Sequence, residues 1–417
     1  MSEEPLSTPG KIQPTQEKDR INSLDTLRGF ALMGILVMNI QSFSMPSSAY
    51  FVPDSFGNFE GINQIVWYVG NLFFDQKFMA MFSMMFGAGI VLMSRGRDAV
   101  GKPVLGIHYR RMLLLLLFGL IHAYLIWYGD ILVPYAICGM SVVWVRRWSA
   151  RRLALLGAFL IFFGSLFFLL IGFGASESED VANGVRESME MDEAAAEQEL
   201  AAYRGSWLDA LPDRAAQAAS MHFFLVPVSF FWRISGLMLI GMALFKWQVM
   251  DATRSNRFYT IMALIGGGLG LPLVAFGAYW SQTMKFDVLH MLGFGMLPNW
   301  FGSVGVALMW IALVMLFCRS KAFGKVKYVL SCYGRMAFTN YIGQTVLATF
   351  FFYGYGFGYF GSVDRLGQVG VSVAIWTIQM TFSPIWLKYY QFGPLEWVWR
   401  SGVYKSFQPM RRQPLPE

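Results

Sequence analysis

The sequence predicts an all-α integral membrane protein that crosses the bilayer many times. Of its 417 residues, 55% are hydrophobic and only 14% are charged, and the mean hydropathy is +0.45. No water-soluble core could absorb so much apolar surface. The apolar residues also fall into runs close to the roughly 20 residues that a helix needs to cross a bilayer. We therefore expect a polytopic helical bundle.

Ten apolar runs are long enough to be membrane-spanning helices. They lie at 27–45, 76–94, 110–128, 131–146, 153–173, 222–246, 257–280, 299–318, 334–353 and 367–386. The stretch 62–74 is too short and too aromatic for a span, so we predict an interfacial or re-entrant helix there.

Loop charge predicts the orientation. With both termini in the cytoplasm, 26 of the 33 Lys and Arg residues fall in inner segments, as expected for cytoplasmic loops. The seven others are Lys77, Arg186, Arg204, Arg214, Arg233, Lys285 and Arg365. The polar segment 1–19 has no apolar core of the signal-peptide type, so we expect a flexible cytoplasmic tail.

The spans divide into two halves around one acidic segment. We predict an N-terminal helical half at 20–173, an extracytoplasmic loop at 174–220, a C-terminal half at 221–403 and a cytoplasmic tail at 404–417. The Ala- and Glu-rich composition of 176–213 is typical of amphipathic helices. This loop is either a cap over the bundle or a solvated surface loop.

Composition argues against several other classes of protein. The basic residues are scattered through short loops, which does not favour nucleic-acid binding. Cys138, Cys318 and Cys332 have neither the spacing of a metal site nor that of a disulfide framework. We expect no metal, and we interpret the cysteines as packing residues.

Arg233 is the clearest charge inside a predicted span. A charge at the bilayer centre costs about 2.5–3.5 kcal/mol on insertion scales, so such residues usually have a role. Arg233 is either an anion clamp for a substrate or the partner of a buried acid such as Asp75 or Asp130.

His122 and Asp130 are the candidates for acid–base chemistry. Eight residues are close to two helical turns, so both side chains share one face if the helix continues to Asp130. A neutral imidazole oriented by a carboxylate is suited to remove a proton from a hydroxyl or amine. The alternative is a core histidine whose hydrogen bonds are simply satisfied.

Three segments resemble a known family of bacterial membrane proteins. RINSLDTLRGFALMGILVMN (20–39), GRMAFTNYIGQ (334–344) and GPLEWVWR (393–400) resemble the YeiB family. That family is grouped with the acyltransferases related to the heparan-glucosaminide N-acetyltransferase. The resemblance implies a protein of the bacterial inner (cytoplasmic) membrane that transfers an acyl group across or at the membrane.

The same resemblance points to Asn39. It matches an asparagine that lies beside the active site of the heparan acetyltransferase. That enzyme's catalytic histidine follows shortly afterwards, but here the corresponding stretch, QSFSMPSSAYFV, has Tyr50 and no histidine. Either His122 supplies the base from another helix, or the chemistry differs. Asn39 on its own is also compatible with a bridge between helices.

Further polar residues are assigned to substrates. Arg28, Arg110, Arg111 and Arg335 stand at cytoplasmic span ends, where they suit the phosphates of acyl-CoA or acetyl-CoA, although ordinary positive-inside anchoring also explains them. Asn340 and Gln344, four residues apart, share a helix face and are candidates for substrate binding.

The function expected from these residues and the resemblance is acyl transfer, for example of acetyl, from cytoplasmic acyl-CoA to a hydroxyl- or amine-bearing acceptor in the membrane or beyond it. The alternatives are a transporter or flippase of an anionic lipid or metabolite, with Arg233 as its binding group, and a non-enzymatic partner of an envelope assembly. The identity of the acceptor and assembly into a homo-oligomer stay open.

Overall fold

The computed structural model describes residues 21–98, 101, 103–189 and 193–412, and these residues form a bundle of helices. Apart from helices, the described residues contain a single isolated β-bridge, between Tyr390 and Arg411. The predicted tail at 1–19 and the last residues of the tail at 404–417 lie outside the described residues.

Eight helical stretches are long and apolar enough to cross a membrane, counting the described residues. They are α1 (Asn22–Ser44), α3 (Ile62–Phe73) with α4 (Lys77–Asp98), α5 (Leu105–Ile121) with η2 (His122–Ile126), α7 (Ala150–Glu177), α10 (Leu211–Ser220) with η4 (Met221–Phe230) and α11 (Phe231–Lys246), α12 (Asn256–Thr283), α13 (Val288–His290) with η5 (Met291–Gly295) and α14 (Met296–Arg319), and α17 (Arg365–Tyr389). The chain is therefore an all-α, multi-pass membrane protein, as predicted.

The other two predicted spans are shorter helices. The run 131–146 forms α6 (Leu132–Val142) and η3 (Val143–Val145). The run 334–353 is interrupted at Met336, where a φ of −104° separates α15 (Gly324–Arg335) from α16 (Ala337–Phe352). Hydropathy does not register a break of this kind. The span predicted from the apolar run is therefore longer than the helix α16 that forms there. The expected short helix at 62–74 is α3.

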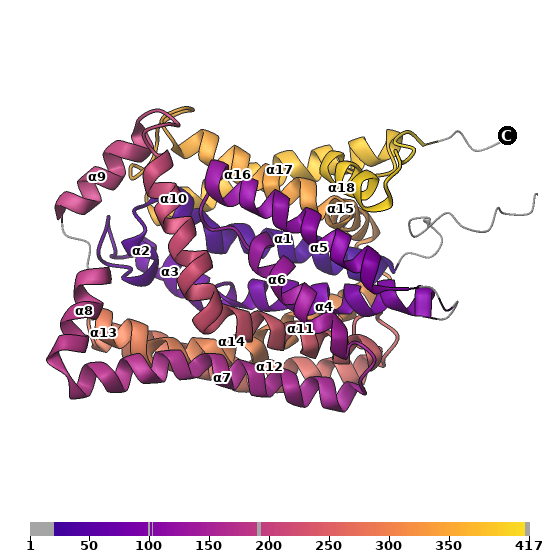
Figure 1. Ribbon diagram of the computed structural model, residues 1–417, viewed down its shortest axis with the longest axis horizontal. Coiled ribbons are helices and arrows are strands. Elements are labelled where there is room, and N and C mark those ends of the chain that lie inside the picture. The colour runs from indigo at the N-terminus through magenta and orange to yellow at the C-terminus, as the bar shows by residue number, and fades with distance from the viewer. Residues whose placement is uncertain (1–20, 99–100, 102, 190–192, 413–417) are drawn as a thin grey trace, which may run out of the picture.

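The remaining short helices gather at the two ends of the bundle (Figure 1). We call one of them the cap end; it carries α2 (Ser48–Phe51), α8 (Glu179–Met189) and α9 (Glu193–Arg204). The opposite end, which we call the terminal end, carries α15 and α18 (Pro394–Tyr404).

Helix α9 and the start of α10, which continues into the bundle, pack as a cap over one end. Glu199 accepts hydrogen bonds from the Ser47 backbone N–H, with N···O distances of 3.1 Å. Arg214, which is fully buried, donates from Nε to the Tyr124 carbonyl at 3.0 Å. These contacts tie the cap to the start of α2 and to η2, which a solvated loop would not do.

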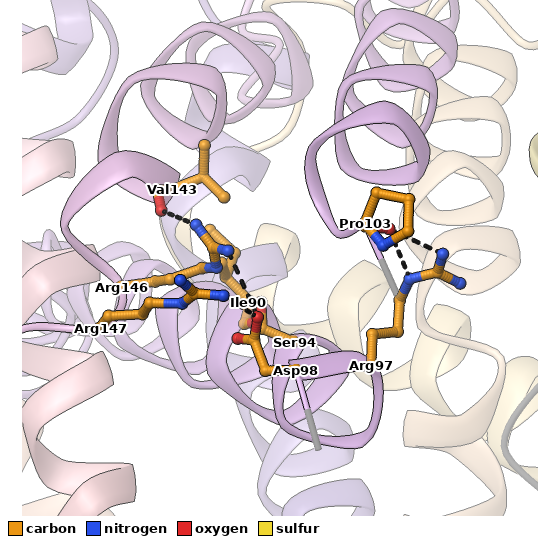
Figure 2. A network of polar contacts seen from close by, with 8 residues as sticks. All are labelled: Ile90, Ser94, Arg97, Asp98, Pro103, Val143, Arg146 and Arg147. Carbon is orange, nitrogen blue, oxygen red and sulfur yellow. Dashed lines mark hydrogen bonds and ion pairs between the residues drawn. The ribbon is translucent and has the colours of Figure 1, made fainter. Parts of the chain in front are cut away.

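An ion-pair cluster joins two loops at the terminal end (Figure 2). Asp98, the last residue of α4, lies 2.6 Å from Arg147 and 3.5 Å from Arg146, both of which follow η3. Arg97 donates to the carbonyl of Pro103. The basic residues of these loops therefore lie together at one end of the bundle.

The two halves of the chain form one packed bundle. Helix α11, from the C-terminal half, packs against both α4 and α7 of the N-terminal half. A Cβ on Gly87 of α4 would lie 1.9 Å from the Met238 carbonyl oxygen, and a Cβ on Gly241 of α11 would lie 1.9 Å from that of Met84. Only glycine permits so close an approach of two helix backbones.

Candidate functional site

A mostly apolar cavity of about 70 Å³ lies near the cap end, between α1, α2, α3, α12 and α14. Its walls include apolar residues such as Val37, Trp67 and Met296. Its polar groups come from Gln41, Tyr50, Asn71, Asp75, Gln76, Ser281 and Asn299. A mostly apolar cavity with a few convergent polar groups is the usual form of a small-molecule site.

Asp75 is held in the wall of this cavity by two hydrogen-bond donors. It stands in the tight turn between α3 and α4, where its N–H donates to the Gly70 carbonyl at 2.8 Å. The Tyr50 hydroxyl donates to Oδ1 at 2.8 Å, and the Asn299 side chain donates from Nδ2 to Oδ2 at 2.7 Å. A carboxylate oxygen has two lone pairs, so Asp75 can still accept a further hydrogen bond from a ligand.

Tyr50 serves here as a donor. Burial, together with the neighbouring Asp75 carboxylate, raises the pKa of Tyr50 well above its ordinary value. The phenol therefore keeps its proton at neutral pH and fixes the orientation of the carboxylate.

Lys77 extends this network into the bundle. It is fully buried, and its Nζ donates to Oδ1 of Asn299 at 2.6 Å and to the backbone carbonyl of Asn71. Asn299 thus links the ammonium of Lys77 to the carboxylate of Asp75, because a carboxamide can accept from one and donate to the other.

Arg233 is fully buried as well, and its hydrogen-bond partners are neutral. Its Nη1 donates to the Trp300 carbonyl and its Nη2 to Oγ of Ser303, each at 2.7 Å, and the guanidinium lies 4.1 Å from the centre of the Trp300 ring. The predicted partner acids Asp75 and Asp130 form no ion pair with it among the described residues. Arg233 does not line the cavity, and the charge of Asp75 acts on it only from beyond ion-pair distance, so its role as an anion clamp stays a prediction.

His122 and Asp130 are brought together, but by a route other than the predicted one. The helix ends at Ile126, and extended backbone at Trp127 (φ −159°) turns the chain back, so that Nδ1 of His122 lies 2.7 Å from Oδ1 of Asp130. Nε2 of His122 lies 2.9 Å from the hydroxyl of Thr345 on α16. Both ring nitrogens are engaged, and neither His122 nor Asp130 is more than 2% exposed. The two residues do not line the Asp75 cavity.

Asn340 and Gln344 lie in a buried polar network between helices. Asn340 donates to the Tyr333 carbonyl and to Ser383, and Gln344 donates to the Leu32 carbonyl and to the Tyr333 hydroxyl. Their amide groups therefore join α16 to its neighbours.

Asn39 is half-buried on α1 and lines neither this cavity nor a second, smaller one described below. Among the described residues, no side-chain hydrogen bond involves it.

The four arginines assigned to a CoA donor lie toward the terminal end. Arg28 pairs with Asp25 at 2.9 Å, and Arg110 donates to the Val403 carbonyl at 2.8 Å. Arg111 stacks on the Trp399 ring at 4.9 Å. Arg28, Arg110, Arg111 and Arg335 are all half-buried, so each retains some accessible surface.

In the part of the chain that the structure describes, no group of three His, Cys, Asp or Glu residues lies close enough together to hold a metal ion.

Sequence reasoning did not predict that Asp75, Lys77 and Asn299 would form a site together. Lys77 and its neighbour Asp75 were visible as charges at the start of an apolar run, which is a signal of intramembrane function.

Comparison with known proteins identifies the family. A family model described as a protein of unknown function (DUF418) matches residues 244–406. The chain is 30% identical to the uncharacterized protein YxaH of Bacillus subtilis, over 96% of this chain and 98% of that protein. It is also 30% identical to the uncharacterized protein YeiB of Escherichia coli, over 94% and 98% of the two chains, and 25% identical to an uncharacterized 39.9 kDa protein of Bacillus acidopullulyticus. Similarity at this level over nearly the whole length shows that the chain belongs to the YeiB family of membrane proteins.

Proposed function

We propose that this protein transfers an acyl group from acyl-CoA to a hydroxyl or amine of an acceptor that enters the Asp75 cavity. The observation that carries the proposal is a carboxylate oriented by two donors, Tyr50 and Asn299, in the wall of a cavity with mixed polar and apolar lining. A positioned base in a cavity is the minimum that acyl transfer to an O–H or N–H requires.

The chemistry requires one displacement at the thioester and two proton transfers. The acceptor's proton passes to Asp75 while its oxygen or nitrogen attacks the thioester carbonyl carbon. The carbon–sulfur bond then breaks, and the CoA thiolate leaves and takes up the proton that Asp75 received, which restores the carboxylate. Asn299 and Tyr50 hold the carboxylate in place, and Lys77 supplies positive charge behind it through Asn299.

The resemblance to the heparan acetyltransferase supports the same location. Tyr50 stands in the stretch where that enzyme carries its catalytic histidine, and here Tyr50 is bonded to Asp75. Asp75 thus offers a base near the position where the histidine is missing. His122 has both ring nitrogens engaged, which makes it the weaker choice.

The donor is proposed to bind at the terminal end, which we place in the cytoplasm of a bacterial inner membrane. The half-buried guanidinium groups of Arg28, Arg110, Arg111 and Arg335 would hold its phosphates. Single cysteines at Ser178, near the cap end, and Ser320, near the terminal end, test this orientation. An impermeant thiol reagent added to intact cells should label only the cysteine at 178, and equal labelling of both sites would contradict the proposed topology.

Release of CoA tests the activity. Purified protein in lipid nanodiscs is mixed with acetyl-CoA, and free thiol is measured with and without extracted membrane lipid as acceptor. Asp75→Asn should lower the rate by about 10²- to 10⁴-fold, the usual contribution of a general base. Asp180→Asn, which changes an exposed acid on α8, is the matched control. Thiol release by wild-type protein that does not depend on lipid, or that Asp75→Asn leaves unchanged, would refute the proposal.

Transport is the second candidate, favoured by one observation. Lys77 and Arg233 are two fully buried basic residues, and the charge of one carboxylate, that of Asp75, acts on both. Such an arrangement is typical of intramembrane ion and proton pathways. Movement of a fluorescent phosphatidylglycerol between the leaflets of proteoliposomes, without thiol release, would support a flippase instead.

A further inference from the structure

A second cavity, of about 40 Å³, adjoins the Asp75 cavity near the cap end. It lies between α1, α3 and α17, and Arg365, Gln368, Ser372 and Trp376 supply its polar wall. Val37, Gln41 and Gly70 line both cavities, so the two lie on either side of one shared wall.

The wall of this cavity holds hydrogen-bond donors that have no acceptor. Arg365 is 1% exposed, and its Nη2 donates to the Pro53 carbonyl at 2.6 Å. The guanidinium lies 5.1 Å from the centre of the Phe59 ring, but its Nε and Nη1 have no hydrogen-bond partner among the described residues, and neither has Nε1 of Trp376. Buried donors are nearly always satisfied, so three donor nitrogens without a hydrogen bond around one cavity call for a ligand that accepts.

The missing acceptor is anionic. Arg365 forms no ion pair among the described residues; the charge of Asp54 acts on it only from a distance. Asp364, its neighbour, is engaged in capping α17 through the Gly367 N–H. A guanidinium that presents two adjacent N–H groups matches the oxygens of a phosphate or a carboxylate.

The Asp75 cavity has the opposite deficit. Its unpartnered buried atoms are acceptors, namely Oδ1 of Asn71 and Oε1 of Gln76, and the Asp75 carboxylate lies beside them. These atoms suit the hydroxyl or amino groups of a ligand. The donors lie on one side of the shared wall and the acceptors on the other. One molecule would satisfy both sets if it carried an anionic group beside the donors and hydroxyl or amino groups beside the acceptors.

The surroundings favour a lipid as the source of that molecule. Helices α3 and α17 pack together, and each presents apolar side chains outward next to the cavity. Ile65 and Val69 on α3, and Leu366 and Val373 on α17, are between 46% and 56% exposed. In a membrane protein such a surface faces acyl chains.

We propose that the Arg365 cavity binds the phosphate of a membrane lipid and that the hydroxyl- or amino-bearing headgroup of this lipid enters the Asp75 cavity. The role of that lipid as acyl acceptor rests on the proposed function, but its binding does not.

Lipid retention without any acyl donor tests the binding by itself. Delipidated protein is titrated with phosphatidylglycerol, with diacylglycerol of the same chains and with glycerol 3-phosphate, and the bound molecules are counted by native mass spectrometry. Phosphatidylglycerol should bind at least about tenfold more tightly than diacylglycerol, and Arg365→Gln should remove about 10- to 100-fold of that affinity. Lys285→Gln, which changes an exposed cation near the same end, should have no effect.

A second variant guards against misfolding, because Arg365→Gln also removes the bond to Pro53. Trp376→Phe keeps an aromatic ring, removes one donor and should weaken phosphatidylglycerol binding by about three- to tenfold. Equal retention of diacylglycerol, or unchanged affinity in both folded variants, would overturn the proposal. Binding of glycerol 3-phosphate as tight as that of phosphatidylglycerol would overturn the lipid source. Specific retention without CoA release would leave this inference standing and remove the acyl transfer.

Discussion

Replacing Gly87 by alanine should destabilise the bundle where α4 crosses α11. The new Cβ would lie 1.9 Å from the Met238 carbonyl oxygen, and contacts under 3.0 Å are essentially never observed for real Cβ atoms. The two backbones must therefore separate by about 1 Å, and neither can rotate away from the other, because Gly241 makes the reciprocal contact. Overpacking that moves backbone costs about 1–3 kcal/mol.

Gly89 on the same helix is the matched control. A Cβ there meets nothing within 4 Å. Alanine at position 89 should therefore stabilise the helix by about 0.5–1 kcal/mol through its better helix propensity. The two variants are expected to differ by about 1.5–4 kcal/mol in the free energy of unfolding, measured by denaturation of both proteins in the same detergent. Equal stability of the two would show that the close crossing does not exist.

Three more substitutions address buried charges. Arg233→Lys keeps the charge but loses a charge-assisted hydrogen bond and the stacking on Trp300. It should lower the free energy of unfolding, measured by thermal denaturation, by about 2–4 kcal/mol. A melting temperature equal to that of the wild type would show that the guanidinium contacts contribute nothing. His122→Ala should cost about 3–5 kcal/mol, because it leaves Asp130 buried without its partner; a fall of about a hundredfold in CoA release per folded molecule would return the role of base to His122. Burial raises the pKa of Glu199, so the folded cap binds this proton more tightly than the unfolded chain does. Docking of the cap is thus most stable below the ordinary pKa of a glutamate and weakens as the pH rises through the raised value. Hydrogen exchange of residues 194–218, corrected for intrinsic rates, should show this loss in the wild type and not in Glu199→Gln.

The fold was predictable because the signals for it are local. Apolar length and loop charge act within one segment, so they located the spans, the short helix α3 and the acidic segment that forms the cap. Met336 shows the limit, since a change in backbone dihedral inside an apolar run leaves no trace in hydropathy. The run 334–353 therefore looked like one span.

The candidate site was less predictable because its contacts join distant parts of the chain. Asn299 bonds Asp75 across 224 residues, and no periodicity within one helix reports such a pair. The spacing of His122 and Asp130 suggested a shared helix face, and the two side chains do meet, but through a turn that ends the helix. Arg233 was recognised as a buried charge, whereas its neutral partners on α14 lie about 70 residues away along the chain.

The family signatures report packing more than chemistry. A Cβ on Gly334 would lie 1.9 Å from the Asp25 carbonyl oxygen, so the signatures at the two ends of the chain meet backbone to backbone. Glu396 of the third signature accepts the Phe338 N–H at 2.7 Å and caps the start of α16. All these contacts lie toward the terminal end, whereas the residues that could bind or activate a ligand near the cap end, such as Asp75 and Arg365, belong to none of the three segments. Resemblance in those segments therefore reports mainly the architecture and, through Arg28 and Arg335, the proposed donor end, whereas the acceptor must be sought in polar residues such as Asp75 and Arg365 that the signatures do not contain.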